Sequence, residues 1–240
     1  MKSAFKGFPA EGLQFLRDLA ENNDREWFAP RKQQFEELLR MPAIELVREL
    51  HREMLQFAPE YVGEPAKCVF RIYRDTRFSK DKTPYKDHIA ASFWRNDLAK
   101  GEGAGFYVGI SPKEIEIAGG LYHPDPKTLL AVRQYVADNA DEFRETFVSR
   151  KVKKLLGEMQ GETAARAPKG FDPEHPAIDL LKHKQFLLYT MLDPAVALTP
   201  KLFREVLDRF EAVASFIRFL NAPLTRRTSV NLEFHPHGSR

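Results

Sequence analysis

The spacing of apolar residues changes twice along this chain. Between residues 10 and 57 they recur every three or four positions, which predicts helices. Between residues 67 and 119 they alternate with polar residues, as Ile115 and Ile117 do with their glutamate neighbours, which predicts strands. Helical spacing returns after Asp125. Helices, then strands, then helices again is the order of an α+β protein.

The expected elements follow from this spacing and from cap and turn residues. We expect helices at residues 10–21, 31–40, 42–57, 126–138, 140–156 and 176–183, and a last helix from Thr199-Pro200 that stops at Asn221-Ala222-Pro223. We expect strands at residues 67–73, 88–95, 104–110, 114–119 and 185–191. Short links between the central strands favour an antiparallel β-meander packed with N-terminal and C-terminal helices. The expected organisation is a single domain at residues 1–223 and a polar, extended or mobile tail at residues 224–240.

The overall charge is close to balance. The 240 residues include 37 Lys and Arg against 34 Asp and Glu, a net charge of +3, which argues against a histone-like nucleic-acid binder. Cys68 is the single cysteine of the sequence, so an intramolecular disulfide cannot form, and its apolar neighbours predict a buried, unreactive thiol. The sequence shows neither a signal-peptide pattern nor an apolar run of the roughly 18 residues that a membrane helix needs. We therefore expect a cytoplasmic protein without a membrane partner.

Residues 67–88, called the basic segment below, carry more net charge than the whole chain. They contain seven basic and three acidic side chains, a net charge of +4, so the remaining residues sum to −1. The segment begins as a predicted strand, leaves it near Asp75 and turns at residues 81–84. Cations this dense repel one another unless carboxylates or a bound anion neutralise them.

The functional interpretation of the basic segment is an oxyanion site for a phosphate or carboxylate group. Arginine pairs with such groups through two parallel hydrogen bonds, lysine supplies a point charge, and a tyrosine hydroxyl donates one bond. The predicted anion-binding residues are Arg71, Arg74, Arg77, Lys82, Tyr85 and Lys86. Asp75 and Asp81 would orient the guanidiniums. His88 is the one candidate proton carrier, because imidazole titrates near neutral pH.

A simpler structural alternative stands beside each of these interpretations. The basic segment would be a salt-bridged loop in which Asp75 holds Arg71 or Arg74 and Asp81 caps the turn. His88 would be a hydrogen-bonded residue of the sheet. Asp75, Asp81 and His88 make a weak metal set, because the surrounding cations oppose a dication. We therefore expect neither a metal nor a cofactor, and the catalytic residues stay unknown.

The basic segment also resembles a family signature. An uncharacterised, mainly bacterial family, domain of unknown function 2461, has a signature similar to the run Arg71-x-x-Arg74-Asp75-x-Arg77-Phe78-Ser79-x-Asp81-Lys82-x-Pro84-Tyr85-Lys86. Further stretches that resemble the family are Asn22-Asn23-x-Arg25-x-Trp27-Phe28, Gly105-Phe106-Tyr107 through Gly119-Gly120-x-Tyr122-x-Pro124, and Pro168-Lys169-Gly170-Phe171 with His175-Pro176. The resemblance covers about residues 5–222 and implies a single α+β domain. It implies no established activity and no assigned catalytic residue.

Three classes of function stay open at this stage. The favoured class is a protein that binds or acts on a phosphorylated or otherwise anionic small molecule at the basic segment, with the reaction unknown. The second is a protein-interaction module that docks an acidic partner through Lys80, Lys82 and Lys86. The third is a nucleic-acid-binding module, in which aromatic residues between the cations would stack on bases. The near-neutral overall charge counts against the third class. The sequence leaves the identity of the ligand and the oligomeric state undetermined.

Overall fold

The protein, seen in a computed structural model, is described at residues 4–99 and 101–232. Contacts divide the described chain into two compact units. The first unit consists of the residues up to Phe93, with Phe106–Ala118 and Thr190–Glu211. The second consists of Trp94–Gly105, Gly119–Tyr189 and the residues from Ala212 onward. The described residues contain no helix with the length and apolar character that crossing a membrane requires.

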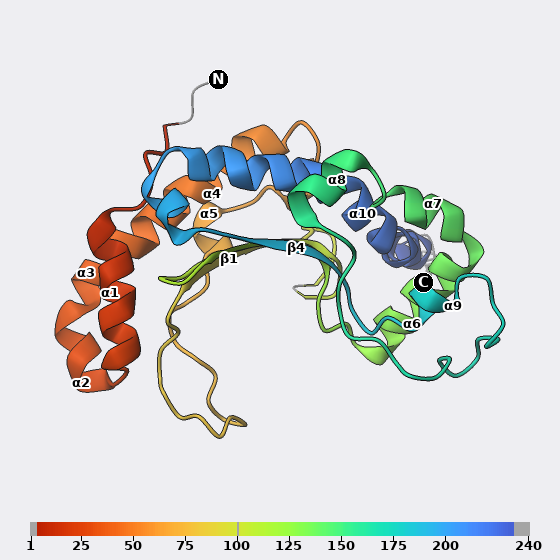
Figure 1. The fold of residues 1–240 in the computed structure, drawn as a ribbon, viewed down its shortest axis with the longest axis horizontal. Helices are drawn as coiled ribbons and strands as arrows, with labels where there is room; N and C mark the ends of the chain where they lie inside the picture. Colours follow the sequence, from red (N-terminus) through yellow and green to blue (C-terminus); the bar gives the residue numbers. More distant parts are fainter. Residues whose placement is uncertain (1–3, 100, 233–240) are drawn as a thin grey trace, which may run out of the picture. The chain divides into compact units, whose positions relative to one another are not determined.

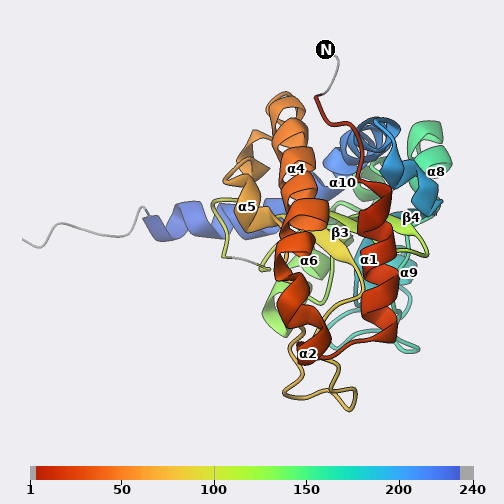
Figure 2. The ribbon, with the colours of Figure 1, turned by 90° about the vertical axis from the view of Figure 1, so that its left-hand side faces the viewer.

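The first unit begins with a series of helices (Figure 2). They are α1 (Ala10–Glu21), α2 (Arg25–Phe28), the 3-10 turn η1 (Ala29–Arg31), α3 (Lys32–Phe35), the π-helical turn η2 (Glu36–Arg40), α4 (Met41–Met54), the 3-10 turn η3 (Pro59–Tyr61) and α5 (Pro65–Cys68). Apolar residues of α1 and α4 are buried at helical spacing, as the sequence predicts. Pro42 lies in the first turn of α4, directly after the π-helical turn η2.

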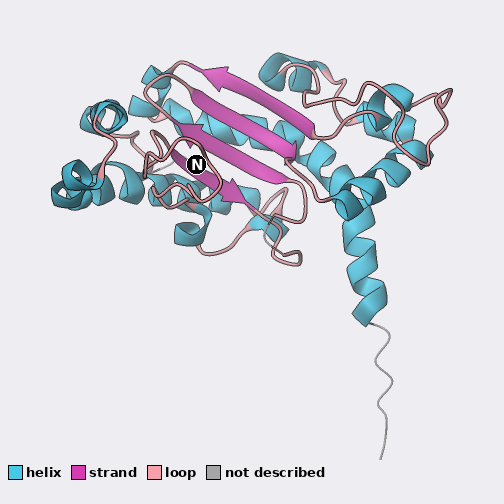
Figure 3. Ribbon diagram, turned by 90° about the horizontal axis from the view of Figure 1, so that it is seen from below, coloured by secondary structure: helices cyan, strands magenta, loops and turns pink. Residues whose placement is uncertain are grey.

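Four strands form one antiparallel sheet in chain order (Figure 3). They are β1 (Ile89–Phe93), β2 (Gly105–Ile110), β3 (Ile115–Leu121) and β4 (Phe186–Leu192). β1 pairs with β2 so that Ala91 lies opposite Val108. The predicted turn closes the β2–β3 hairpin, where the Ser111 N–H donates to the Glu114 carbonyl over 3.0 Å. The expected α+β class and β-meander are thereby confirmed.

A core of aromatic side chains fixes β1 in the first unit. All five residues of β1 are buried. Phe93 of β1 and Phe106 of β2 lie opposite each other, and their rings contact Phe210 at centroid distances of 5.2 and 4.9 Å. Phe210 belongs to α10 (Lys201–Leu232), which follows the 3-10 turn η4 (Pro194–Leu198). Burial of these large rings is a strong stabilising contribution, so the basic segment leads directly into a rigid strand.

The second unit contains the remaining helices, which are α6 (Pro126–Asp138), α7 (Ala140–Glu145), α8 (Arg150–Leu156), α9 (Ile178–Leu181) and the later residues of α10. The Asp125 carboxylate accepts hydrogen bonds from the backbone N–H groups of Lys127 and Thr128, at 2.8 and 3.1 Å. These bonds cap α6 where the Asp125-Pro126 pair predicts a helix start. The expected helix at residues 140–156 is present in two pieces.

The expected strand at residues 67–73 is wrong. Its first two residues belong to α5, and the remainder makes only isolated bridges, from Val69 to Ala91 and from Tyr73 to Tyr85. Val69 and Tyr73 are four positions apart, whereas their partners Ala91 and Tyr85 are six positions apart. The pairing therefore shifts register between the two bridges, as at a bulge. Val69 and Ile72 are both buried, which breaks the expected alternation of faces.

Two further expectations, on Cys68 and on the end of the last helix, are wrong. Cys68 is half-buried at the end of α5, with its Sγ 3.8 Å from His51 Nε2, instead of lying inside a strand. The last helix passes Asn221 and contains Pro223. Asn221 is 1% exposed, and its side-chain amide accepts from the Ala104 N–H at 2.8 Å and donates to the Ala104 carbonyl at 2.9 Å. The expected stop residue is therefore a buried tertiary contact. The expected tail is helical at residues 224–232, and residues 233–240 lie outside the described residues.

Candidate functional site

The basic segment forms a long loop that extends away from the sheet before it enters β1 (Figure 1). The two arms of the loop are joined at its base. Tyr73 and Tyr85 form a bridge, and the Arg74 N–H donates to the Pro84 carbonyl over 2.9 Å. A further bond runs from the Lys86 N–H to the Ile72 carbonyl at 2.8 Å. The base of the loop is thus held by backbone pairing, and the charged residues that lie beyond that pairing are Asp75, Arg77, Lys80, Asp81 and Lys82.

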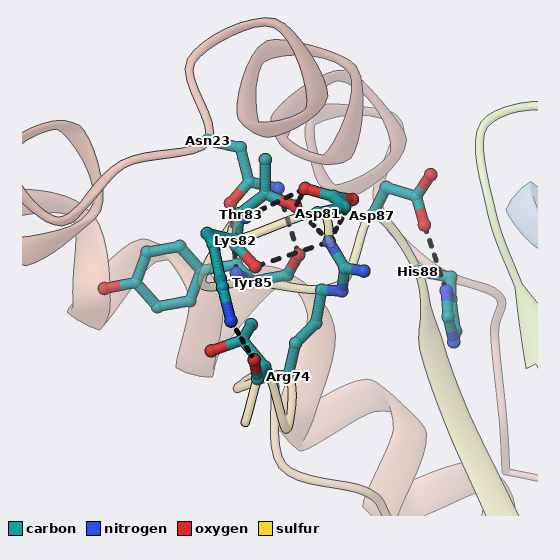
Figure 4. Close-up of polar contacts among 9 residues, drawn as sticks. Asn23, Arg74, Asp81, Lys82, Thr83, Tyr85, Asp87 and His88 are labelled. Atoms are coloured by element: carbon teal, nitrogen blue, oxygen red, sulfur yellow. Dashed lines mark hydrogen bonds and ion pairs between the residues drawn. The ribbon is translucent and has the colours of Figure 1, made fainter. Parts of the chain in front are cut away.

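Arg74 is tied to the far arm of the loop (Figure 4). Its Nη1 donates to the Asp81 carboxylate at 2.5 Å and to the Thr83 hydroxyl. Asp81 also accepts from the N–H and the hydroxyl of Thr83, at 3.0 and 2.9 Å. The backbone bond from Thr83, followed by the bond from Arg74, lowers the pKa of Asp81 to about 2. The carboxylate is therefore ionised at neutral pH and holds the two arms together.

Arg77 is committed to a neighbouring carboxylate. Its Nε and Nη2 donate to the two oxygens of Asp75 at 3.0 and 2.8 Å, a bidentate pair. This side-chain hydrogen bonding is the main cause that lowers the pKa of Asp75 to about 2. Both residues are exposed, so the pair contributes little to overall stability. The planar fork that would bind an external anion is occupied by Asp75.

The two lysines of the predicted site bond to backbone carbonyls. Lys82 Nζ donates to the Thr76 carbonyl at 2.9 Å, which ties the far arm of the loop to the near one (Figure 4). Lys86 Nζ donates to the Arg71 carbonyl at 3.2 Å and lies 4.7 Å above the Phe70 ring, a cation–π contact. The loop backbone thus takes part in placing both charges.

The segment that connects α1 and α2 packs against the base of this loop. The Asn23 side chain donates to the Tyr85 carbonyl and accepts from the Tyr85 N–H, both at 3.0 Å. Asp24 caps α2 by accepting from the Trp27 N–H at 2.8 Å. Phe28 of α2 then stacks on the Tyr85 ring at a centroid distance of 4.2 Å. The Asn23 side chain and the Phe28–Tyr85 stack thus join two segments that lie far apart in the sequence.

A cleft of about 480 Å³ opens where these segments meet. We call it the aromatic–basic cleft. Its lining residues are Arg25, Phe28, Ala29, Lys32, Tyr73, Arg74, Thr76, Pro84 and Tyr85. Three of these side chains are cations, three are aromatic and none is a carboxylate. Its volume falls within the range of small-molecule sites.

A second hollow of about 670 Å³ lies beside the cleft and is more open. It shares Arg25, Thr76 and Pro84 with the cleft. Its other lining residues are Asn23, Asp24, Glu26, Lys82 and Thr83. Two carboxylates and two cations therefore border this hollow, which makes it a poorer anion site than the aromatic–basic cleft.

The structure divides the predicted anion-binding residues into three groups. Arg74 and Tyr85 line the aromatic–basic cleft, and Lys82 lines the second hollow. The predicted residues that line neither space are Arg71, Arg77 and Lys86. Asp75 and Asp81 each hold an arginine in place, although Asp75 holds Arg77 and not Arg71 or Arg74.

Sequence reasoning missed the residues that α2 and α3 contribute to the cleft, Arg25, Phe28 and Lys32. The available signal was the Asn22-Asn23-x-Arg25-x-Trp27-Phe28 stretch, whose resemblance to the family pairs it with the basic segment. Spacing alone could not place Arg25 beside Arg74.

His88, the candidate proton carrier, lines neither the cleft nor the hollow. Its Nδ1 lies 3.1 Å from the Asp87 carboxylate, and this hydrogen bond is the main cause that lowers the pKa of Asp87 (Figure 4). Among the described residues, we find no group of three or more His, Cys, Asp or Glu side chains arranged to hold a metal ion.

The glycine pair of the second family stretch serves packing within the second unit. Gly120 has a φ of +138°, and a Cβ there would collide with the Phe186 carbonyl of β4. A Cβ at Gly119 would lie 2.6 Å from Val213 Cγ1 of α10. Close approach of protein backbone and side chains therefore accounts for both glycines.

The fold and the site together define an α+β protein with an open cleft of aromatic and cationic side chains. The model of a family described as conserved hypothetical protein (DUF2461) matches residues 11–219. The chain belongs to this family, and the match includes every lining residue of the cleft and the hollow. No curated protein matches the chain.

Proposed function

We propose that the protein binds a phosphorylated or otherwise anionic small molecule in the aromatic–basic cleft. The observation that carries this proposal is the convergence of Arg25, Lys32 and Arg74 on a space whose described lining contains no carboxylate. An anion held there would be attracted by all three cations without a competing acidic group. The described lining also holds no His or Cys, so the proposal concerns binding and names no reaction.

The availability of the three cations supports this proposal. Arg25 and Lys32 are exposed, and neither forms an ion pair within the described residues. Arg74 uses its Nη1 for Asp81 and Thr83, while its Nε and Nη2 bond to none of the described residues. A guanidinium that is fixed by one carboxylate still offers N–H donors on its other edge. Arg74 would therefore be a positioned donor, and Arg25 and Lys32 would adapt to the ligand.

Calorimetric titration with inorganic phosphate and pyrophosphate tests the proposal. The wild-type protein should bind at least one of them saturably, and Arg25→Ala with Lys32→Ala should weaken the affinity about tenfold or more, as expected for the loss of charge-assisted bonds. The matched control is Arg77→Ala with Lys80→Ala, which removes the same charge from the loop but not from the cleft. Equal affinity in the cleft variant and the wild type would refute the proposal, and so would an equal loss in the control.

A second candidate function rests on one exposed side chain. Phe78 is 94% exposed on the basic segment, and the Arg77 guanidinium lies 5.6 Å from its ring centroid. An exposed aromatic residue among cations is suited to docking an acidic protein partner. Pull-down with Phe78→Ser, and with charge reversal at Lys80, Lys82 and Lys86, should then lose the partner. The Arg25→Ala and Lys32→Ala variant should keep it.

A further inference from the structure

We infer that the anion bound in the aromatic–basic cleft carries a planar aromatic ring, as a mononucleotide does. This inference rests on the proposed function and specifies the class of ligand. It requires a ring surface that is open to the cleft, cations that line the same cleft, and a space that holds one ligand.

The open ring surface belongs to Tyr73. Phe28 and Tyr85 are 2% and 5% exposed, whereas Tyr73 is 42% exposed. Tyr85 stacks on Phe28 at 4.2 Å, and Tyr73 lies 5.4 Å from Tyr85 and 6.5 Å from Phe28, edge-on to the latter. The two buried rings thus hold Tyr73 in one orientation from behind. The free part of a fixed ring is a preorganised stacking surface, since little side-chain freedom remains to be lost on binding.

Arg25, Lys32 and Arg74 line the same cleft as these rings. Arg25 belongs to α2, as does Phe28, and it lines the cleft together with Tyr85. Arg74 follows Tyr73 in the chain, and its Nη1 is held by Asp81. A ring stacked on Tyr73 would therefore place an attached phosphate toward Arg74 and Arg25. The adjoining hollow is disfavoured for the phosphate because Asp24 and Glu26 border it.

The size and composition of the cleft favour a single nucleotide over a nucleic-acid strand. Single-strand binders align successive aromatic side chains along a charged groove. In the cleft, Tyr73 is the lining aromatic side chain with substantial exposure. Phe78, the other strongly exposed aromatic residue of the basic segment, lines neither the cleft nor the hollow. A volume of about 480 Å³ suits one ring with its phosphate.

The test compares AMP, ribose 5-phosphate and adenosine by isothermal titration calorimetry. AMP should bind about fivefold or more tightly than ribose 5-phosphate, because its base can stack on the Tyr73 ring. Adenosine should bind more weakly than AMP because it lacks the phosphate. Tyr73→Leu should reduce the preference for AMP over ribose 5-phosphate to about twofold or less.

Two further variants keep this test independent of folding. Tyr73→Phe retains the ring and should retain the preference for AMP. Phe78→Leu removes an exposed ring of the same loop and should change none of the affinities. Equal binding of AMP and ribose 5-phosphate by the wild type would overturn the inference and leave the proposed function standing. Failure of AMP, ribose 5-phosphate and inorganic phosphate alike would overturn both, and an AMP preference that survives Tyr73→Leu would overturn the assignment to this ring.

Discussion

Two aromatic clusters in this protein are built from similar side chains and differ in what borders them. In the second unit, Phe143 lies within 6 Å, between ring centroids, of its four aromatic neighbours Phe147, Phe186, Phe216 and Phe219, and all five rings are buried. In the first unit, Phe28, Tyr73 and Tyr85 form a cluster that ends at the aromatic–basic cleft, where Tyr73 remains exposed. The Phe143 cluster is enclosed on all sides and is a structural core, and we call it the closed cluster. The cluster of Phe28, Tyr73 and Tyr85 has an open side bordered by cations. We call it the open cluster, and it is a candidate binding surface.

The closed cluster should show the largest effect of a single substitution. Phe143→Ala removes a fully buried ring and leaves a cavity among its neighbours. We expect the free energy of unfolding to fall by about 3–5 kcal/mol, as for other buried phenylalanines. Urea denaturation followed by circular dichroism measures this loss. A loss below about 1 kcal/mol would show that the cluster is not the core described above.

The open cluster should tolerate the loss of its outermost ring. Tyr73→Leu keeps an apolar side chain against Phe28 and Tyr85, and 42% of Tyr73 already faces solvent. We expect the free energy of unfolding to fall by about 1 kcal/mol or less. The same denaturation experiment gives the comparison with Phe143→Ala. Equal losses in the two variants would remove the distinction between the clusters.

The ion-paired loop beside the open cluster should respond to acid. The pKa of Asp81 is about 2, below its ordinary value of 3.8, so the ionised carboxylate stabilises the folded loop above about pH 4. This contribution decreases as the pH falls below about 4 and is lost as the pH passes through about 2. NMR titration of the Asp81 carboxyl carbon should give a midpoint near 2 in the wild type.

Arg74→Gln should raise that midpoint only part of the way, because the Thr83 backbone bond remains. The control, Arg77→Gln, should raise the midpoint of Asp75 and leave that of Asp81 in place. A wild-type Asp81 midpoint near 3.8 would contradict the contacts between Asp81, Thr83 and Arg74.

Local patterns were sufficient for most of the fold. The β2–β3 hairpin and the start of α6 were both predictable, because alternation, a turn cluster and an Asp-Pro cap act over a few residues. The end of α10 was not predictable, because the partner of Asn221 is Ala104, 117 positions away. Likewise, the alternation of apolar and polar residues at 67–73 could not predict the register shift, because the shift arises from pairing with residues 85 and 91.

The candidate site was predictable to a smaller extent. Charge counting located the basic segment, and the structure places Arg74 and Tyr85 of that segment in the cleft. Charge counting could not show that the Arg77 guanidinium is paired with Asp75. Neighbouring opposite charges at an exposed site can pair or point apart with little difference in energy. Nor could charge counting identify Arg25 and Lys32 as partners of Arg74, because they lie in a separate segment of the chain.

The amino-acid sequence by itself determined the α+β order of elements, the surplus of charge at residues 67–88 and the resemblance to the family, since each is written in neighbouring residues. Tertiary structure alone decided which cations share a space. Asn23 bonds to the Tyr85 backbone, 62 positions away, and Phe28 stacks on the Tyr85 ring. As a result, Arg25 and Lys32 line the same cleft as Arg74. Ion pairs between close neighbours in the sequence form locally and neutralise the cations involved. A cleft instead requires side chains from distant segments, and only tertiary packing brings those together.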